Sequence, residues 1–237
     1  MSLLRTKGLT KRFAGLTAVN NVDFHLEEGR IRGLIGPNGA GKTTLVSLLC
    51  GRIEPSEGSV TFQGRDITAL PAHKRIQAGM AYTFQITSVF AELSVEENVA
   101  LAARRRWPDG VQARVAQAIE RVGLPDEPGT AAGELSYGHQ RLLEVAMGIV
   151  QAPKLLIMDE PTQGLSDGEI VGFKALVRDV AREATVLLIE HNMSVVMELA
   201  DDITVLNFGE ILAEGTPDEV RANKDVQSAY LGGGADA

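Results

Sequence analysis

A glycine-rich stretch between an apolar run and a helix-compatible segment is the feature that most constrains the fold. Residues Gly36 to Thr44 read GPNGAGKTT, a full match to the pattern G-x-x-x-x-G-K-[ST], and they follow IRGLI and precede TLVSLLC. Glycines let the backbone wrap closely, so that its N–H groups point inward, and the following helix adds the positive end of its dipole. We therefore expect a cradle for phosphate oxygens between a strand and a helix.

The residues of this stretch have different expected tasks. The Lys42 ammonium would reach the β and γ phosphates of a nucleotide, which makes it a catalytic as well as a binding residue, and the Thr43 hydroxyl would ligate Mg²⁺. The pattern alone indicates a nucleotide phosphate and leaves GTPases, kinases and motor ATPases open. The nucleotide-binding residues predicted here are Gly36, Pro37, Asn38, Gly39, Ala40, Gly41, Lys42, Thr43 and Thr44.

Two adjacent acids follow the apolar run LLIM, as expected where a buried parallel strand delivers carboxylates at its C-terminal end. Asp159 would hold Mg²⁺, directly or through water. Glu160 would be the catalytic base that polarises the attacking water, a role that needs a carboxylate within hydrogen-bond reach. The alternative is a strand end with solvated acids, and the phosphate motif upstream favours the functional interpretation.

A further apolar run, Thr185 to Ile189, ends at Glu190 and His191. This places an imidazole at another strand end that faces the same edge of the sheet. We interpret His191 as a catalytic residue that senses the γ-phosphate or positions the water, although a lone histidine is often structural. The other histidines lack the spacing of metal ligands, so metal binding by protein side chains alone is not indicated.

The order of patterns along the chain predicts an α/β protein. Near-alternating apolar residues and Gly-bounded turns in the first segment indicate an antiparallel region, whereas IRGLIG, KLLIMD and TVLLIE indicate parallel strands covered on both faces. Between them, strand patterns vanish and the sequence predicts helices over 94–104, 111–122 and 142–151. Ser94 and Glu97 form the sequence pattern of a capping box at the first of these helices.

Composition narrows the classes of partner and compartment. The 44% apolar content suits one large domain, and the single Cys50, within LVSLLC, is expected to be a buried filler. The net charge of -8 argues against a nucleic-acid or anionic-lipid surface. The chain lacks an apolar run of membrane-span length, and its start lacks the apolar core of a secretory signal. We expect a cytoplasmic protein that meets a membrane through a protein partner.

The segment LSYGHQ, Leu135 to Gln140, resembles the LSGGQ signature of the ATP-binding-cassette (ABC) family, and with the motifs above the resemblance spans nearly the whole chain. The resemblance implies an ATPase with a P-loop NTPase (RecA-like) α/β core, an N-terminal antiparallel β subdomain and an inserted α-helical subdomain. It also implies one domain over 1–237, in which 1–85 and 153–237 form the core and 86–152 form the helical lobe with the signature.

The same resemblance implies further site residues. In the family, the signature of one cassette contacts the γ-phosphate held by another cassette, a role that would pass to Ser136 and Gly138. Phe13 would stack on adenine, Gln85 would link Mg²⁺ to the transport domain, and His191 would be the switch histidine. Phe13 packed in the sheet and Gln85 as an ordinary surface residue remain alternatives. The chain departs from the family pattern at Tyr137, His139 and Ser166.

Extended pieces such as AVNNVDF, LSVEENV and DVQSAYLG resemble the ATPase subunits of branched-chain amino-acid importers. The resemblance implies Mg²⁺-dependent ATP hydrolysis at the inner face of the cell membrane. The implied partners are integral membrane permease subunits, a second ABC ATPase subunit (an identical copy or a sister cassette) and, indirectly, a solute-binding protein, with no nucleic acid. A urea or short-amide importer, a lipopolysaccharide-export ATPase and a soluble cassette ATPase are the alternatives, since an ATPase subunit does not touch the solute.

Overall fold

A mostly parallel sheet runs through the middle of the chain in the computed structural model, which describes residues 2–83, 88–104, 106–107, 109–124 and 129–231. Five of its strands are parallel and an antiparallel strand forms one edge. Strands β4, β9 and β8 are buried along their whole length, as expected for parallel strands covered on both faces. The strand order is β11 (Glu210–Gly215), β10 (Asp202–Asn207), β4 (Ile31–Ile35), β9 (Thr185–Ile189), β8 (Leu155–Asp159) and β7 (Met80–Thr83).

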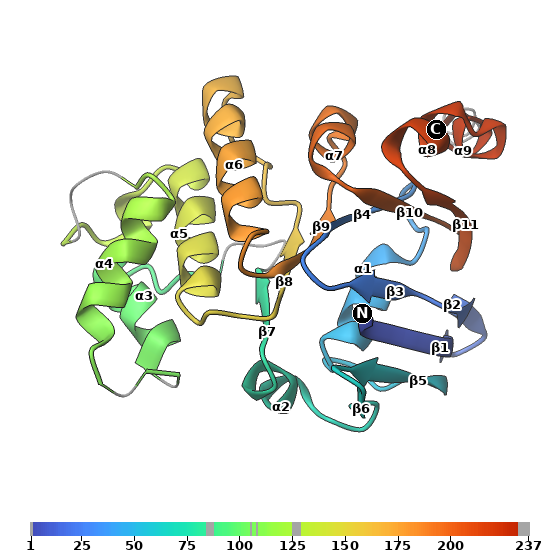
Figure 1. The fold of residues 1–237 in the computed structure, drawn as a ribbon, viewed down its shortest axis with the longest axis horizontal. Helices are drawn as coiled ribbons and strands as arrows, with labels where there is room; N and C mark the ends of the chain where they lie inside the picture. The colour runs from blue at the N-terminus through green and yellow to red at the C-terminus, as the bar shows by residue number, and fades with distance from the viewer. Residues whose placement is uncertain (1, 84–87, 105, 108, 125–128, 232–237) are drawn as a thin grey trace.

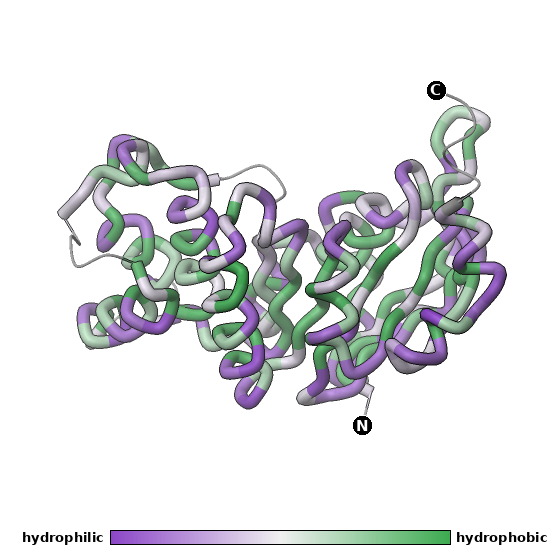
Figure 2. Tube along the Cα trace, turned by 90° about the horizontal axis from the view of Figure 1, so that it is seen from above, coloured by the Kyte–Doolittle hydropathy of each residue, from purple (hydrophilic) through white to green (hydrophobic). Residues whose placement is uncertain are grey.

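A second, antiparallel sheet packs against the first across helix α1, Lys42–Leu49 (Figure 1). Apolar residues of α1 share one buried cluster with residues of both sheets, so the helix that follows the glycine-rich stretch lies within the core. Hydrophobic stretches of the chain run through the middle of the molecule in Figure 2. The antiparallel sheet contains β1 (Ser2–Phe13), β2 (Leu16–Val22), β3 (His25–Glu27), β5 (Glu57–Phe62) and β6 (Arg65–Asp66).

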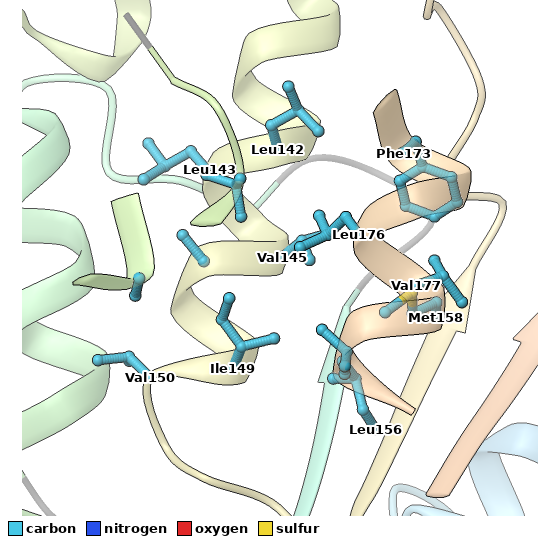
Figure 3. Packing of buried hydrophobic residues seen from close by; sticks show 14 of the residues in the cluster. Leu142, Leu143, Val145, Ile149, Val150, Leu156, Met158, Phe173, Leu176 and Val177 are labelled. Atoms are coloured by element: carbon cyan, nitrogen blue, oxygen red, sulfur yellow. The ribbon is translucent and has the colours of Figure 1, made fainter. Parts of the chain in front are cut away.

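Helices inserted between β7 and β8 pack together at one end of the molecule (Figure 1). One of them, α5 (Tyr137–Ile149), lies against α6 (Asp167–Val180) and β8 through a cluster that includes Leu142, Val145, Phe173 and Met158 (Figure 3). The predicted fold class, with its antiparallel region and inserted helical part, is confirmed. The other elements of this insertion are α3 (Val95–Arg104), α4 (Val111–Arg121) and a short 3₁₀ helix at Ala132–Glu134.

The predicted helices match the structure unequally. The first begins at the predicted capping box, in which the Glu97 N–H donates to Ser94 Oγ (3.1 Å) and the Ser94 N–H donates to Glu97 Oε2 (2.8 Å). The prediction for 142–151 was wrong at its start, because α5 already begins at Tyr137. The Ser136 hydroxyl accepts a hydrogen bond from the His139 N–H (3.2 Å), and this N-cap starts the helix inside the LSYGHQ segment.

Two of the remaining helices contact β11, and another contacts the edge strand β7. A third buried cluster joins Val196 and Val220 of two of these helices to Ile203 and Val205 of β10. Cys50, after α1, is buried as predicted, and burial raises the pKa of its thiol to about 12. None of the described helices is long and apolar enough for a membrane span. These helices are α2 (Ala72–Gln77), α7 (Met193–Leu199), α8 (Pro217–Ala222) and α9 (Lys224–Leu231).

Candidate functional site

The glycine-rich stretch forms a tight loop between β4 and α1, and neighbouring backbone fixes two of its glycines. A Cβ at Gly36 would lie 2.2 Å from the carbonyl oxygen of Leu206, and one at Gly41 would lie 2.4 Å from that of Ala18. Gly41 also has a φ of 101°, which side-chain-bearing residues rarely adopt. These positions therefore need glycine both for space and for backbone conformation.

Lys42, the first residue of α1, is held inside this loop. Its Nζ donates to the carbonyl oxygens of Gly36 (2.6 Å) and Pro37 (3.1 Å), and the side chain is buried. Burial lowers the pKa of Lys42, while the nearby charges of Glu160 and Asp159 oppose that shift. The ammonium is therefore a cation that the fold places in the loop at a desolvation cost, which an added anion would offset.

Asp159 ends β8 and lies almost fully buried at the edge of the site. Its Oδ2 accepts a hydrogen bond from the Tyr82 hydroxyl (2.7 Å), which comes from the neighbouring strand β7. Burial raises the pKa of Asp159, and the Tyr82 hydrogen bond opposes this shift by favouring the ionised carboxylate. Tyr82 thus supports the carboxylate that the sequence predicts as a metal ligand.

Glu160 and His191 meet at the ends of adjacent strands. Glu160 Oε1 lies 2.9 Å from His191 Nε2, so β8 and β9 bring together the residues that the sequence predicts as base and sensor. Glu160 is mostly buried and His191 is half exposed. Glu160 also has a φ of 50°, a left-handed conformation that is uncommon for a residue with a side chain. Such conformations gather at functional sites, where the surrounding structure holds them in place.

The buried carboxylate of Glu190 connects the loop that follows Glu160 to the backbone at His191. Its Oε1 accepts hydrogen bonds from the Thr162 backbone N–H (2.8 Å) and hydroxyl (2.6 Å), in the loop after Glu160. Its Oε2 accepts from the backbone N–H of His191 (3.1 Å). The Glu190 carboxylate therefore links the segments that follow β8 and β9, and this link supports the contact between Glu160 and His191.

A cavity of about 470 Å³ brings most of these groups to one place. Lys42, Thr43, Asp159, Glu160 and His191 all line it, which is the combination of cation, hydroxyl and carboxylates that a magnesium–triphosphate site requires. The described residues that line it are Leu16, Thr17, Ala18, Asn38, Gly39, Ala40, Gly41, Lys42, Thr43, Thr44, Asp159, Glu160, Ile189, His191, Phe208 and Gly209.

Other predicted site residues lie elsewhere. Among the described residues that line the cavity, Phe13, Ser136 and Gly138 are absent, as are Gly36 and Pro37 at the start of the glycine-rich loop. Phe13 ends β1, is partly exposed, and has the Lys11 ammonium 5.1 Å from its ring centre. Gln85 lies outside the described residues, so its role stays a prediction.

The residues that depart from the family pattern lie close to the segment that leads into α6. The Tyr137 ring lies against Gly164, and Gly138 lies close to the Gly164 carbonyl. Ser166, which stands where the resemblance predicts Asp, caps α6 through a capping box with Glu169. His139 Nε2 lies 3.7 Å from Glu169 Oε1. The unusual residues therefore join the first turns of α5 and α6.

Sequence reasoning missed several residues that shape the site. Tyr82 is 77 positions away from Asp159, and no local pattern marked their contact. Glu190 was identified only as a strand end, although an acid directly before His191 could have indicated a brace. Phe208, which lines the cavity, lies in NFGE, and a large apolar residue directly before a glycine was the available signal.

The fold and this cavity define a P-loop NTPase in which a carboxylate and an imidazole from adjacent strands face the phosphate loop. The family model described as "ABC transporter" matches residues 19–163. The chain therefore belongs to the ABC transporter family, as one of its nucleotide-binding, ATP-hydrolysing cassettes. A second family model, described as "Branched-chain amino acid ATP-binding cassette transporter", matches residues 210–236.

Curated relatives cover almost the full length of the chain. The branched-chain amino-acid transport ATP-binding protein BraF of Pseudomonas aeruginosa is 40% identical over 97% of this chain and 98% of its own. LivG of Salmonella typhimurium, with the same description, has the same identity and coverage. The lipopolysaccharide export system ATP-binding protein LptB of Acidithiobacillus ferridurans is 33% identical, and the match covers 97% of both chains.

Solved structures with the same fold include a nucleotide-free ATP-binding cassette from an ABC transporter. That structure matches with a TM-score of 0.87 and 29% identity, over 97% of this chain and 99% of the other. The ADP conformation of another ABC-transporter cassette matches with a TM-score of 0.86 and 28% identity, over 98% of this chain and 99% of the other.

Proposed function

We propose that this chain is the ATPase subunit that energises an importer of branched-chain amino acids, acting at the inner face of the cell membrane. The full-length similarity to BraF and LivG supports the solute, and so does the match of residues 210–236 to the branched-chain family model. The geometric observation that carries the chemistry is the 2.9 Å contact between Glu160 and His191 at the cavity that holds Lys42. One ABC ATPase domain, with a core over 1–85 and 153–237 and a helical lobe over 86–152, is the proposed organisation.

In the proposed mechanism, the residues from Gly36 to Thr44 enclose the phosphates of ATP, and Lys42 neutralises the β and γ phosphates. Because Lys42 is already buried beside the cavity, little reorganisation accompanies the reaction. Glu160 orients the attacking water and accepts its proton. His191, in contact with the Glu160 carboxylate, holds that carboxylate in place and reaches the γ-phosphate.

The oxygen donors at the cavity fit a magnesium ion. Thr43 supplies a hydroxyl and Asp159 a carboxylate, and both line the same cavity. Mg²⁺ takes oxygen ligands and bridges phosphates, and when bound it supplies charge that stabilises the transferred phosphoryl group. The raised pKa of Asp159 fits this assignment, because a buried carboxylate gains stability from a nearby cation. Gln85 is proposed as a further ligand on the resemblance alone.

We further propose that a second ATPase subunit completes the site. Ser136 and Gly138 lie outside the cavity of their own chain, and Ser136 begins α5 as its N-cap. A helix N-terminus attracts anions, so α5 of one subunit can address the γ-phosphate bound by the other. ATP would then lie between two subunits, and hydrolysis would depend on their association.

A permease contact is proposed at an apolar cavity of about 230 Å³ between the helical insertion and β7. Met80 and Tyr82 line it from β7, and Ala102, Met147 and Gly148 line it from the helices. An apolar lining suits a helix from a membrane subunit. The solute-binding protein would act through that permease without touching this chain.

A Glu160→Gln variant tests the proposed base. The amide keeps the shape but accepts protons poorly, so ATP turnover should fall at least about 100-fold, the lower range for general-base catalysis. ATP should then hold the subunits as a stable dimer, detected by size-exclusion chromatography. Glu183→Gln, at an exposed carboxylate in the turn after α6, is the control and should leave turnover unchanged. An active Glu160→Gln protein would refute the assignment.

The similarity to LptB supports a second candidate, an ATPase subunit for lipopolysaccharide export. The two candidates differ in the membrane subunit that this chain binds. Co-purification with its membrane subunits, followed by transport assays of that complex with leucine, isoleucine and valine, distinguishes them. ATP-dependent uptake of these amino acids supports import, whereas release of lipopolysaccharide from membranes without uptake supports export.

A further inference from the structure

The turn between β10 and β11 carries a phenylalanine in an unfavourable position. Asn207 pairs with Glu210, so Phe208 and Gly209 form a two-residue hairpin loop. Their φ values of 48° and 81° are both positive, as in a type I′ turn, which favours Asn, Asp or Gly at the first position. Phe208 is also 86% exposed. An exposed aromatic ring in a left-handed conformation is costly for the folded protein, which points to a ligand.

This turn is attached directly to the phosphate-binding loop. The Gly209 N–H donates to the carbonyl oxygen of Ala40 (2.9 Å), and the Gly209 carbonyl accepts from the Asn20 N–H (2.8 Å). A Cβ at Gly41 would lie 3.3 Å from the Gly209 Cα, so the two backbones are in close contact. Phe208 is therefore held beside the phosphate site by the two backbone hydrogen bonds of the next residue, Gly209.

Phe208 and Leu16 add an apolar surface to a cavity in which the residues with a proposed role in phosphate and Mg²⁺ binding are polar. Both side chains are well exposed, and both line the cavity that contains Lys42 and Thr43. Phosphates and Mg²⁺ gain nothing from an aromatic ring. A nucleobase does, because aromatic side chains stack on the faces of bases and the apolar surface of both is removed from water.

We propose that Phe208, with Leu16 beside it, binds the base of the nucleotide whose phosphates occupy the glycine-rich loop. This inference rests on the proposed nucleotide site and extends it to the β10–β11 turn. The resemblance assigns the base to Phe13, which ends β1 with Lys11 near its ring and is absent from the described lining of the cavity. The β10–β11 turn therefore couples the position of the base to that of the loop that holds the phosphates.

The test compares ADP with inorganic pyrophosphate, which shares the diphosphate but lacks the base. Phe208→Asn is the informative variant, because Asn suits the type I′ turn and should keep or raise the melting temperature. It should weaken ADP binding at least about 5-fold, the lower range for one base–aromatic stack, and leave pyrophosphate binding unchanged. Phe208→Tyr keeps a ring and should bind ADP as the wild-type protein does. Calorimetric titration of the purified chain measures each affinity.

The other outcomes separate this inference from its alternatives. Unchanged ADP affinity in Phe208→Asn, with weaker binding in Phe13→Ala, would overturn it in favour of Phe13. Equal losses of ADP and pyrophosphate affinity would also overturn it, since the turn would then only support the phosphate loop. A change confined to subunit association, measured by sedimentation, would assign Phe208 to an interface. Lys42→Ala should weaken both ligands; if it does not, the phosphate site itself is wrong.

Discussion

The buried ion pair on α5 leads to a quantitative prediction for stability. Arg141 Nη1 lies 3.0 Å from Glu144 Oε2, and both side chains are at most 5% exposed. Glu144 Oε1 also accepts the Ser88 N–H (2.6 Å), and Arg141 Nη2 donates to the Tyr137 hydroxyl (3.2 Å). The pair therefore joins the start of α5 to the segment that precedes α3.

Arg141→Met should destabilise the protein by about 3 to 5 kcal/mol, because it leaves the Glu144 charge buried without its cation. For a chain of this length, about 2 to 4 °C of melting temperature is lost per kcal/mol, so we expect a decrease of at least about 6 °C. The control is Arg178→Met, which breaks the exposed pair with Glu198 and should cost less than about 1 kcal/mol.

The double variant Arg141→Met/Glu144→Met separates the interaction from general disruption. Replacing both charges with apolar side chains removes the buried unpaired carboxylate, so much of the stability should return. Thermal unfolding followed by circular dichroism gives the four melting temperatures of the cycle, those of the wild-type protein, Arg141→Met, Glu144→Met and the double variant. The reasoning is wrong if Arg141→Met lowers the melting temperature no more than Arg178→Met does. It is also wrong if the double variant has a lower melting temperature than both Arg141→Met and Glu144→Met.

The pH dependence of the Arg141→Met deficit follows from the same carboxylate. Burial already raises the pKa of Glu144, and the Ser88 N–H and the Arg141 charge oppose the shift. Without Arg141 the folded-state pKa rises further. A carboxyl with a raised folded-state pKa binds its proton more tightly when folded, so stability is gained as pH falls through that pKa. The deficit of Arg141→Met should therefore be smaller in mild acid than at pH 7.

Further predictions concern the ends of β8 and α6. Tyr82→Phe removes the hydroxyl that supports Asp159, and such supporting hydrogen bonds typically change metal affinity 10- to 100-fold. The Mg²⁺ concentration for half-maximal ATPase activity should therefore rise about 10-fold, and an unchanged requirement would exclude Asp159 as the supported ligand. Ser166→Ala removes the N-cap of α6 and should cost about 1 kcal/mol, or about 2 to 4 °C of melting temperature. An unchanged melting temperature of Ser166→Ala would mean that Glu169 and the backbone suffice as a cap.

The sequence predicts the fold class and the polar centre of the site because both depend on local patterns. The run before Asp159 is buried throughout, and a buried parallel strand can only deliver its polar residues at its end. The glycine pattern specifies its own backbone, since Gly36 and Gly41 have no room for a Cβ. In these segments, local preference and tertiary environment require the same residues.

Contacts between distant segments were not predictable in this way. The start of α5 was missed because Gly138 and the polar residues after Ser136 do not continue an apolar helical period. Tyr82 reads as an ordinary strand residue until β7 is placed beside β8, and only that pairing brings its hydroxyl to Asp159. Pairing between strands far apart in sequence is set by the whole sheet, which no single window of residues encodes.

The β10–β11 turn contacts both sheets beside the cavity, so a nucleotide bound there affects how the two sheets are held together during the ATPase cycle. The turn binds the phosphate loop through the Gly209 N–H and binds β2 through the Gly209 carbonyl, so it connects both sheets at the cavity. A nucleotide that contacts Phe208 while its phosphates fill the loop would therefore hold these parts at a fixed spacing. Tripolyphosphate, which lacks the base, would occupy only the loop. ATP should therefore dimerise the Glu160→Gln subunit at concentrations where tripolyphosphate, bound to the same extent, does not.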